Sequence, residues 1–216
     1  MALVRYDTRE VQFKLVYCGP PEGGKTTNLH YIHRRLDSYL RGDLISVATD
    51  QNRTISFDFL PIHTTEIEGY QTRFQLYTVP GQDVLSETRK NVLAGADGIV
   101  FVADSTTSRM DSNLNAYENC RNALEENRID PDRLPFSFQY NKRDLADATS
   151  PDVMDQMFGV KRASFFACAT SGYQVFATLD DLTKQVIKGF HSQTIRKERG
   201  RGVSRRESEV AVALKS

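Results

Sequence analysis

The chain has 216 residues, of which 39% are hydrophobic and 26% are charged, a composition that suits one soluble domain with a single core. Its 28 basic and 28 acidic residues balance, so the net charge does not indicate a nucleic-acid or membrane-surface partner. The three cysteines are too few and too widely spaced for a disulfide framework, and the N-terminal residues lack the apolar run of a secretory signal, so we expect a cytoplasmic protein.

Strand-like and helix-like patterns alternate along the chain. In chain order, the predicted elements are a strand at 11–17, a helix after the glycine-rich segment 19–27, strands at 54–61, 70–79 and 98–104, a helix at 111–127, a strand at 136–140, a helix at 151–158, a strand at 164–169 and a helix at 175–190. The two alternating strands at 54–61 and 70–79 flank a turn, which predicts an antiparallel hairpin. The order as a whole predicts an α/β fold: a doubly wound, mostly parallel sheet with an antiparallel edge hairpin.

The segment GPPEGGKTT, residues 19–27, has the spacing Gly-x-x-x-x-Gly-Lys-Ser/Thr of a phosphate-binding loop. In such a P-loop, backbone N–H groups and a helix N-terminus hold phosphate, the lysine reaches the β- and γ-phosphates, and the hydroxyl binds Mg²⁺. The predicted strand before the segment and the predicted helix after it are the context that the motif requires. We predict that these residues of the loop bind a nucleotide: Gly19, Gly23, Gly24, Lys25, Thr26 and Thr27.

The tetrapeptide NKRD follows a predicted strand at the point where a base would lie, and it fits the guanine pattern Asn-Lys-x-Asp with Asn141, Lys142 and Asp144. A carboxylate at Asp144 can accept both N1–H and the exocyclic amine of guanine, whereas adenine offers no such pair of donors. The stem of Lys142 can lie over the ring. At the end of the next strand, Ala169 and Thr170 either offer backbone N–H groups to the guanine carbonyl or form a plain turn.

Two further segments contain candidate catalytic and metal-binding residues. In VPGQ, Gly81 can turn its N–H toward the γ-phosphate, and Gln82 can orient an attacking water. Thr54 is a candidate second Mg²⁺ ligand beside Thr26, and Arg53 can neutralise the charge that develops during phosphoryl transfer. The alternative for these segments is a plain turn and a solvated loop.

On these residues the chain resembles the Ras-like small GTPases, most closely the bacterial gliding-motility and cell-polarity (MglA-like) type. The resemblance spans about residues 5–190 and is carried by REVQFKLVYCGP, GGKTTNL, RTISFDFLP, TRFQLYTVPGQ, GADGIVFVADS and QYNKRDL. It implies a Mg²⁺-dependent switch between GTP and GDP that hydrolyses GTP, binds effectors of polarity or motility machinery, and is recruited to a cell pole. It also implies a roadblock-domain GTPase-activating protein as a partner, Gln82 as a catalytic residue and Arg53 as an internal arginine finger.

The chain departs from the Ras-like pattern in two places. Thr78 stands where most Ras-like proteins have the aspartate that holds a Mg²⁺ water, and Asp58 on the neighbouring strand is a candidate substitute. Pro21 and Glu22 stand in the P-loop where such loops carry small residues, and proline fixes φ and removes one N–H donor. We hypothesise that phosphate binding survives while hydrolysis is slow without a partner. A GTP-binding scaffold with little or no hydrolysis is the alternative.

The last part of the chain differs in composition from the rest. Residues 192–216 contain seven Lys/Arg and three Glu without an apolar period, which predicts a charged, disordered tail. We therefore predict a small GTPase domain at 1–191 followed by this tail, and we expect neither a membrane span nor a nucleic-acid partner.

Overall fold

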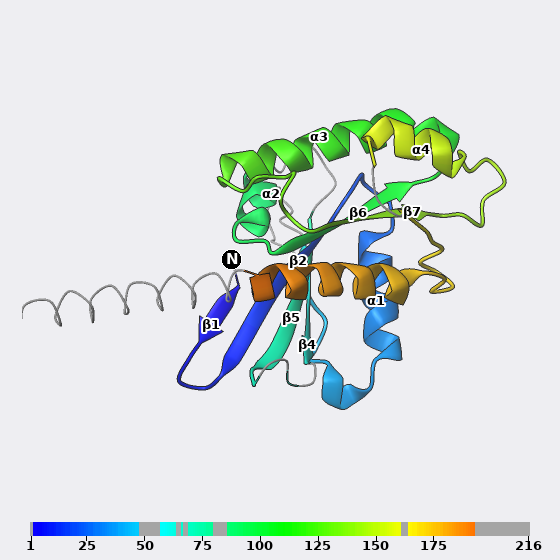
Figure 1. The fold of residues 1–216 in the computed structure, drawn as a ribbon. Coiled ribbons are helices and arrows are strands. Elements are labelled where there is room, and N and C mark those ends of the chain that lie inside the picture. The colour runs from blue at the N-terminus through cyan, green and yellow to red at the C-terminus, as the bar shows by residue number, and fades with distance from the viewer. Residues whose placement is uncertain are drawn as a thin grey trace, which may run out of the picture.

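The computed structural model describes residues 2–47, 57–63, 66, 69–79, 86–160 and 164–192. These residues form one eight-stranded sheet with helices on both of its faces (Figure 1). The strands are β1 (Leu3–Arg5), β2 (Glu10–Cys18), β3 (Ile45–Val47), β4 (Phe57–His63), β5 (Gln71–Thr78), β6 (Gly98–Asp104), β7 (Phe136–Asn141) and β8 (Ser164–Phe166). The helices are α1 (Lys25–Arg35), α2 (Ser86–Leu93), α3 (Met110–Glu126), α4 (Pro151–Phe158), the 3₁₀ turns η1 (Ser38–Leu40) and η3 (Thr107–Arg109), and a helix at 175–192.

The sheet has the predicted mixed topology. Its strand order is β3-β4-β5-β2-β6-β7-β8, and β1 pairs with β2 outside this path. The strands from β5 through β2, β6 and β7 to β8 are parallel neighbours, whereas β3, β4 and β5 pair antiparallel. The prediction of a doubly wound, mostly parallel sheet with an antiparallel edge hairpin is therefore confirmed. None of the helices in the described part of the chain is long and apolar enough to cross a membrane.

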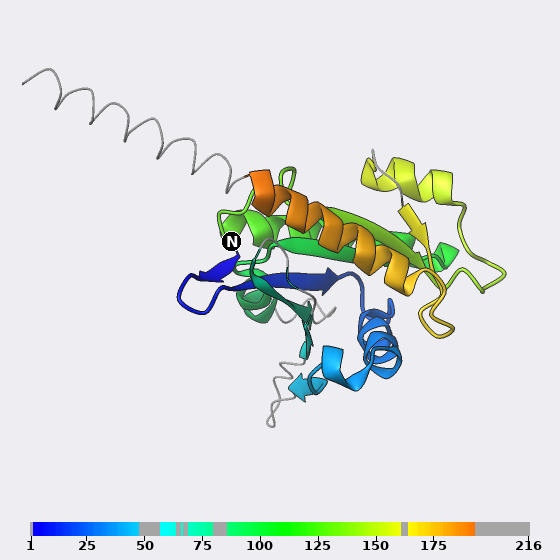
Figure 2. The ribbon, with the colours of Figure 1, turned by 60° about the horizontal axis from the view of Figure 1, so that its bottom comes forward.

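Two hydrophobic cores lie on the two faces of the sheet. The central strand β6 is covered on both faces and is therefore buried along its whole length. On one face, Val100 and Val102 pack in a cluster with residues of α1 and of the helix at 175–192. On the other face, Phe101 packs against α3 and α4, with ring centroids 5.3 Å from both Tyr117 and Phe158. Figure 2 shows the helix at 175–192 running along the sheet beside β6.

Several elements differ from the sequence-based expectation. The strand predicted at 164–169 ends at Phe166, because Cys168 pairs with Tyr173 and accepts a hydrogen bond from the N–H of Gly172, which turns the chain into a loop. β1 and β3 are three-residue edge strands, too short for a visible alternation. α2 was missed because half of its buried residues are polar. Of the tail predicted at 192–216, only Ser192 is described, and it ends the helix that begins at residue 175. Residues 193–216, residues 54–56 of the predicted hairpin and residues 64, 65, 67 and 68 of its turn lie outside the described residues.

Candidate nucleotide-binding site

The P-loop connects the end of β2 to the start of α1, at the carboxyl end of the central strands. Gly19 and Gly24 have φ of +142° and +100°, a region that side-chain-bearing residues rarely adopt. A Cβ at Gly19 would lie 2.1 Å from the carbonyl oxygen of Val102, and one at Gly24 would lie 2.1 Å from Nδ2 of Asn141. The loop is thus packed directly against β6 and against the end of β7, and both glycines are required by backbone conformation and by space.

Lys25 begins α1 and turns its side chain back into the P-loop. The residue is only 7% exposed, and its Nζ donates hydrogen bonds to the carbonyl oxygens of Gly19 at 2.9 Å and Pro20 at 2.6 Å. Burial lowers the pKa of this amine to about 8. The first turn of α1 contains no acidic residue, so the positive end of the helix adds to the lysine charge. A buried cation at a helix N-terminus is suited to bind phosphate.

Asp58 on β4 gathers three hydroxyl groups beside the P-loop. Its Oδ2 accepts hydrogen bonds from Oγ1 of Thr26 at 2.6 Å and from Oγ1 of Thr78 at 3.0 Å. Its Oδ1 accepts one from Oγ of Ser46 at 2.7 Å, and its backbone N–H donates to Thr78 Oγ1 at 2.8 Å. The Asp58 carboxylate is therefore fixed next to Thr26. Thr78, which stands at the position of the usual aspartate, does not replace that carboxylate but orients the carboxylate of Asp58.

This group of oxygen atoms fits Mg²⁺, which binds through one or two carboxylates together with substrate phosphates and water. Within the described ranges, no three His, Cys, Asp or Glu side chains gather into a metal-binding cluster, so the fit is to a metal shared with phosphate rather than to a site built from protein ligands alone. Sequence reasoning named Asp58 only as a candidate substitute, and it missed Ser46.

Asn141 joins the guanine motif to the P-loop. It ends β7, is 3% exposed, and donates a hydrogen bond from Nδ2 to the carbonyl oxygen of Gly23 at 2.8 Å. Its Oδ1 accepts the backbone N–H of Ala169 at 2.9 Å. One side chain thus connects the phosphate loop, the NKRD segment and the loop after β8.

Asp144, three residues after Asn141, is exposed. Its carboxylate has no hydrogen bond or ion pair with any residue that the structure describes.

Lys142 is fixed by a buried carboxylate. It has a φ of +65°, and its Nζ contacts Oδ2 of Asp104 at 2.7 Å. The Asp104 side chain is 1% exposed, and burial by itself raises the pKa of that carboxyl. Hydrogen bonds from Lys142 and Thr106 outweigh this effect, so the pKa is held below its usual value and Asp104 stays charged.

The predicted site residues divide into three groups. Most of them converge on the carboxyl ends of β2, β7 and β8: Gly19, Gly23, Gly24, Lys25, Thr26, Asn141, Lys142, Asp144, Ala169 and Thr170. Thr27 is half-buried on α1, and its hydroxyl makes no hydrogen bond with a described residue. Four predicted residues, Arg53, Thr54, Gly81 and Gln82, lie outside the described residues, so their roles in catalysis and metal binding stay predictions.

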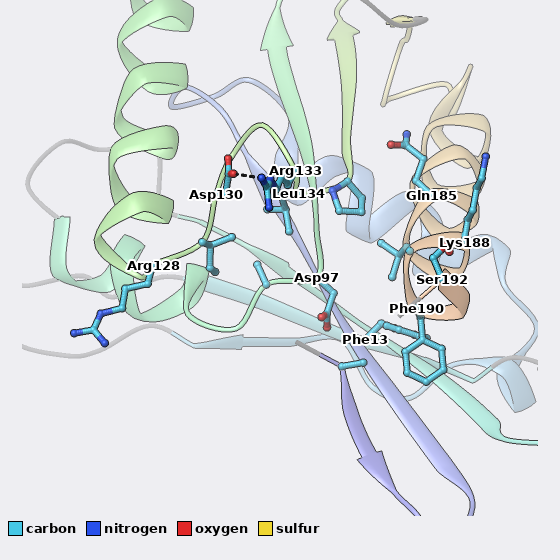
Figure 3. Close-up of a pocket in the computed structure, with 16 residues that line it drawn as sticks. Phe13, Asp97, Arg128, Asp130, Arg133, Leu134, Gln185, Lys188, Phe190 and Ser192 are labelled. Atoms are coloured by element: carbon cyan, nitrogen blue, oxygen red, sulfur yellow. Dashed lines mark hydrogen bonds and ion pairs between the residues drawn. The ribbon is translucent and has the colours of Figure 1, made fainter. Parts of the chain in front are cut away.

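A separate pocket of about 640 Å³ opens at the other end of the sheet (Figure 3). Its lining includes Asp97 and Pro135, which directly precede β6 and β7, and Lys188 of the helix at 175–192. Asp130 and Arg133 form an ion pair at its edge, 3.2 Å apart. Because the P-loop and the guanine motif lie at the opposite, carboxyl ends of the strands, this pocket is not part of the candidate nucleotide site.

Comparison with known proteins agrees with this geometry. The model of the ADP-ribosylation factor family matches residues 2–191. The chain is 44% identical over 188 residues to the mutual gliding-motility protein MglA of Myxococcus xanthus (strain DK1622), which covers 87% of this chain and 96% of that protein. It is 28% identical over 156 residues to the ADP-ribosylation factor-like protein alp41 of Schizosaccharomyces pombe, covering 71% and 72% of the two chains. The chain therefore belongs to the ADP-ribosylation factor family and is a small GTPase of the MglA type.

Proposed function

We propose that the protein is a Mg²⁺-dependent switch that binds and hydrolyses GTP and, in its GTP form, binds effectors that control cell polarity or motility. The name of the M. xanthus relative supports the motility role. The observation that carries the nucleotide part is the position of Asn141, which binds Gly23 of the P-loop and Ala169 of the loop after β8. A phosphate loop and a guanine motif that belong to one site are thereby held at a fixed separation.

The described residues have distinct roles in this proposal. Lys25 and the backbone N–H groups of the P-loop residues other than the two prolines bind the phosphates, and the negative charge of the phosphates restores a high pKa to the lysine amine. Thr26 and Asp58 hold Mg²⁺, which when bound neutralises the β- and γ-phosphate oxygens. Asp144, whose carboxylate is exposed, selects guanine.

The remaining roles extend to residues outside the described ranges. We propose Thr54 as the second hydroxyl ligand of Mg²⁺, Gly81 as a γ-phosphate contact, Gln82 as the group that orients water, and Arg53 as the group that stabilises the transition state. In this proposal hydrolysis is slow until a roadblock-domain partner binds. The GTPase domain comprises residues 1–191, and the protein is cytoplasmic and recruited to a cell pole.

A GTP-binding scaffold that barely hydrolyses is the second candidate, and Pro21 is the observation that favours it. This residue has no N–H to offer to phosphate, and its carbonyl oxygen accepts a hydrogen bond from Arg109 at 2.8 Å, which fixes the peptide in place.

Single-turnover hydrolysis separates the two candidates. The purified protein is loaded with γ-labelled GTP and Mg²⁺, and phosphate release is followed with and without a roadblock-domain protein. We expect slow release that rises with the partner. Tight retention of GTP with no release in either case supports the scaffold, and a failure to retain GTP or GDP at all contradicts both candidates.

A further inference from the structure

Arg109 connects the P-loop to the guanine side of the site. It lies at the end of η3, and its Nη2 donates the hydrogen bond to the carbonyl oxygen of Pro21, 88 positions earlier in the chain. The same guanidinium lies 3.6 Å from the carboxylate of Glu22 and 3.7 Å from that of Asp104. One side chain therefore contacts both unusual residues of the P-loop and the carboxylate that holds Lys142.

A local role in helix α3 does not explain this arrangement. Arg109 is the N-cap residue of α3, yet its side chain makes no capping hydrogen bond. A cation at this end of a helix is electrostatically unfavourable, because the N-terminus carries the positive end of the helix dipole. The arginine thus contributes nothing favourable to the start of α3, and its contacts lie across the site instead.

Asp104 is a firm anchor for these contacts. Its Oδ1 accepts hydrogen bonds from the N–H of Thr106 at 3.0 Å and from the Thr106 hydroxyl at 2.7 Å. Its backbone N–H and carbonyl both bind the side chain of Asn113, at 2.9 and 2.7 Å, which ties the end of β6 to α3. Lys142 and Arg109 share the remaining oxygen, Oδ2, at 2.7 and 3.7 Å.

Burial decides which contacts of Arg109 have the largest effect. The Glu22 side chain is 83% exposed, and exposed ion pairs contribute little because solvent screens them. The Asp104 carboxylate is 1% exposed, so its attraction to the guanidinium is screened far less. The bond to the Pro21 carbonyl has a charged donor, a class of hydrogen bond roughly twice as strong as a neutral pair.

Glu22 adds a reason for the P-loop to need such support. It has a φ of +61°, a conformation that is uncommon for residues other than glycine. A residue in this conformation persists only where its surroundings hold it. Arg109 binds the carbonyl oxygen of the peptide immediately before Glu22, so it holds the loop where the backbone is strained.

We propose that Arg109 is a positioning residue for nucleotide binding: it fastens Pro21 and Glu22 to Asp104, so that the P-loop keeps its place relative to Lys142. The inference rests on the proposed function, because it concerns the same guanine-nucleotide site. It assigns Arg109 no contact with the nucleotide. Loss of the side chain therefore loosens the loop and shortens the time for which nucleotide stays bound.

The test is the dissociation rate of a fluorescent GDP from the full chain with Mg²⁺. We expect Arg109→Ala to accelerate dissociation about tenfold, the effect of losing one charged hydrogen bond. Arg109→Lys keeps the charge but loses the planar guanidinium with its several N–H donors, so we expect the dissociation rate to rise about threefold. Glu22→Ala, which removes only the screened pair, is expected to change the rate by less than about twofold.

Arg121→Ala is the matched control. Arg121 lies on α3, the helix that Arg109 precedes, is 29% exposed compared with 33% for Arg109, and pairs with an exposed carboxylate, Asp132, at 3.0 Å. We expect it to leave the dissociation rate unchanged. Thermal unfolding without nucleotide shows whether each variant is folded. If Arg109→Ala does not fold, the dissociation rate of Arg109→Lys tests the inference instead.

A double variant distinguishes positioning from a general loss of stability. If Arg109 acts through Asp104, Arg109→Ala combined with Asp104→Asn accelerates dissociation by less than the product of the two single effects. A rate for Arg109→Ala within twofold of both wild type and Arg121→Ala, or a purely multiplicative double variant, overturns the inference while the proposed function stands. A wild-type chain that retains no guanine nucleotide overturns both.

Discussion

The two ends of the sheet carry charge in different ways. At the carboxyl end, Lys25, Asp58 and Asp104 are each less than 10% exposed, and every one has hydrogen-bond partners. At the amino end, beside the 640 Å³ pocket, Arg133 and Asp130 are 88% and 52% exposed. Burial of charge costs free energy, and a fold tolerates it where a ligand or a partner compensates. Buried charge identifies the candidate site better than the size of a cavity does.

The largest expected effect is at Lys25, where removal of the charge should abolish nucleotide binding. We expect Lys25→Met to weaken GDP binding by at least about a hundredfold, because several charge-assisted contacts with phosphate are lost together. Isothermal titration with GDP and Mg²⁺ measures this. An affinity within tenfold of wild type would mean that the P-loop binds phosphate without its lysine.

The same variant should make the nucleotide-free protein more stable. In the fold the pKa of Lys25 falls from 10.5 to about 8, so the unfolded chain binds the proton more tightly and the free energy of unfolding falls as the pH drops from 10.5 to 8. At pH 7 the burial of the Lys25 charge lowers the free energy of unfolding of the wild-type protein by an amount on the order of 3 kcal/mol, and the two hydrogen bonds of Nζ offset part of this loss. We therefore expect the free energy of unfolding of Lys25→Met to be about 1 kcal/mol higher than that of wild type at pH 7. Urea unfolding should show the gain at pH 7 and its loss toward pH 10.

Asp58 is expected to give the next largest effect, on the response to Mg²⁺. Nucleotide should leave the wild-type protein much faster when EDTA removes Mg²⁺. Asp58→Asn should reduce this difference by about tenfold or more, because the amide keeps the shape but not the charge. Asp43→Asn, at an exposed position just before β3, is the control. Equal protection by Mg²⁺ in wild type and Asp58→Asn would remove Asp58 from the metal site.

Pro21→Gly tests whether the variant P-loop slows hydrolysis. The change restores one backbone N–H beside the phosphates, and one such donor commonly changes a rate by a factor of ten or more. We expect single-turnover hydrolysis of bound GTP to accelerate about tenfold while GDP affinity stays within about threefold. A variant that hydrolyses no faster than wild type would show that Pro21 is not the cause of slow turnover.

The smallest effect is expected at the amino end. Arg133→Ala removes an exposed ion pair, so the free energy of unfolding should change by no more than about 0.5 kcal/mol. GDP dissociation should not change. A change in dissociation greater than twofold would break the contrast between the two ends, because it would show that the pocket is coupled to the nucleotide site.

The parts of the site that sequence could predict are those with fixed local spacing. The P-loop places Lys25 and Thr26 at the start of a helix by chain geometry alone, and NKRD follows a strand whose apolar pattern is clear. The pattern of alternation also predicted the sheet. Neither inference requires knowledge of how distant segments meet.

The parts that sequence could not predict depend on distant pairs. Asp58 meets Thr26 only because β4 lies next to β5 in the sheet and β5 lies next to β2. Arg109 was not recognised at all, since an arginine in a polar turn resembles any solvated residue and its partner Pro21 is 88 positions away. The edge strands β1 and β3 have only three residues each, which is too few for the sequence to show an alternation of apolar and polar residues.

The bond between Asn141 and Gly23 also has a consequence for synthesis of the protein. The two residues are 118 positions apart, so at ordinary rates of translation the P-loop is made roughly 6 to 24 s before the residue that braces it. Ala169, the other partner of Asn141, is made later still. We therefore expect the emerging chain to have an incomplete P-loop during synthesis and to bind nucleotide only once nearly the whole domain has left the ribosome.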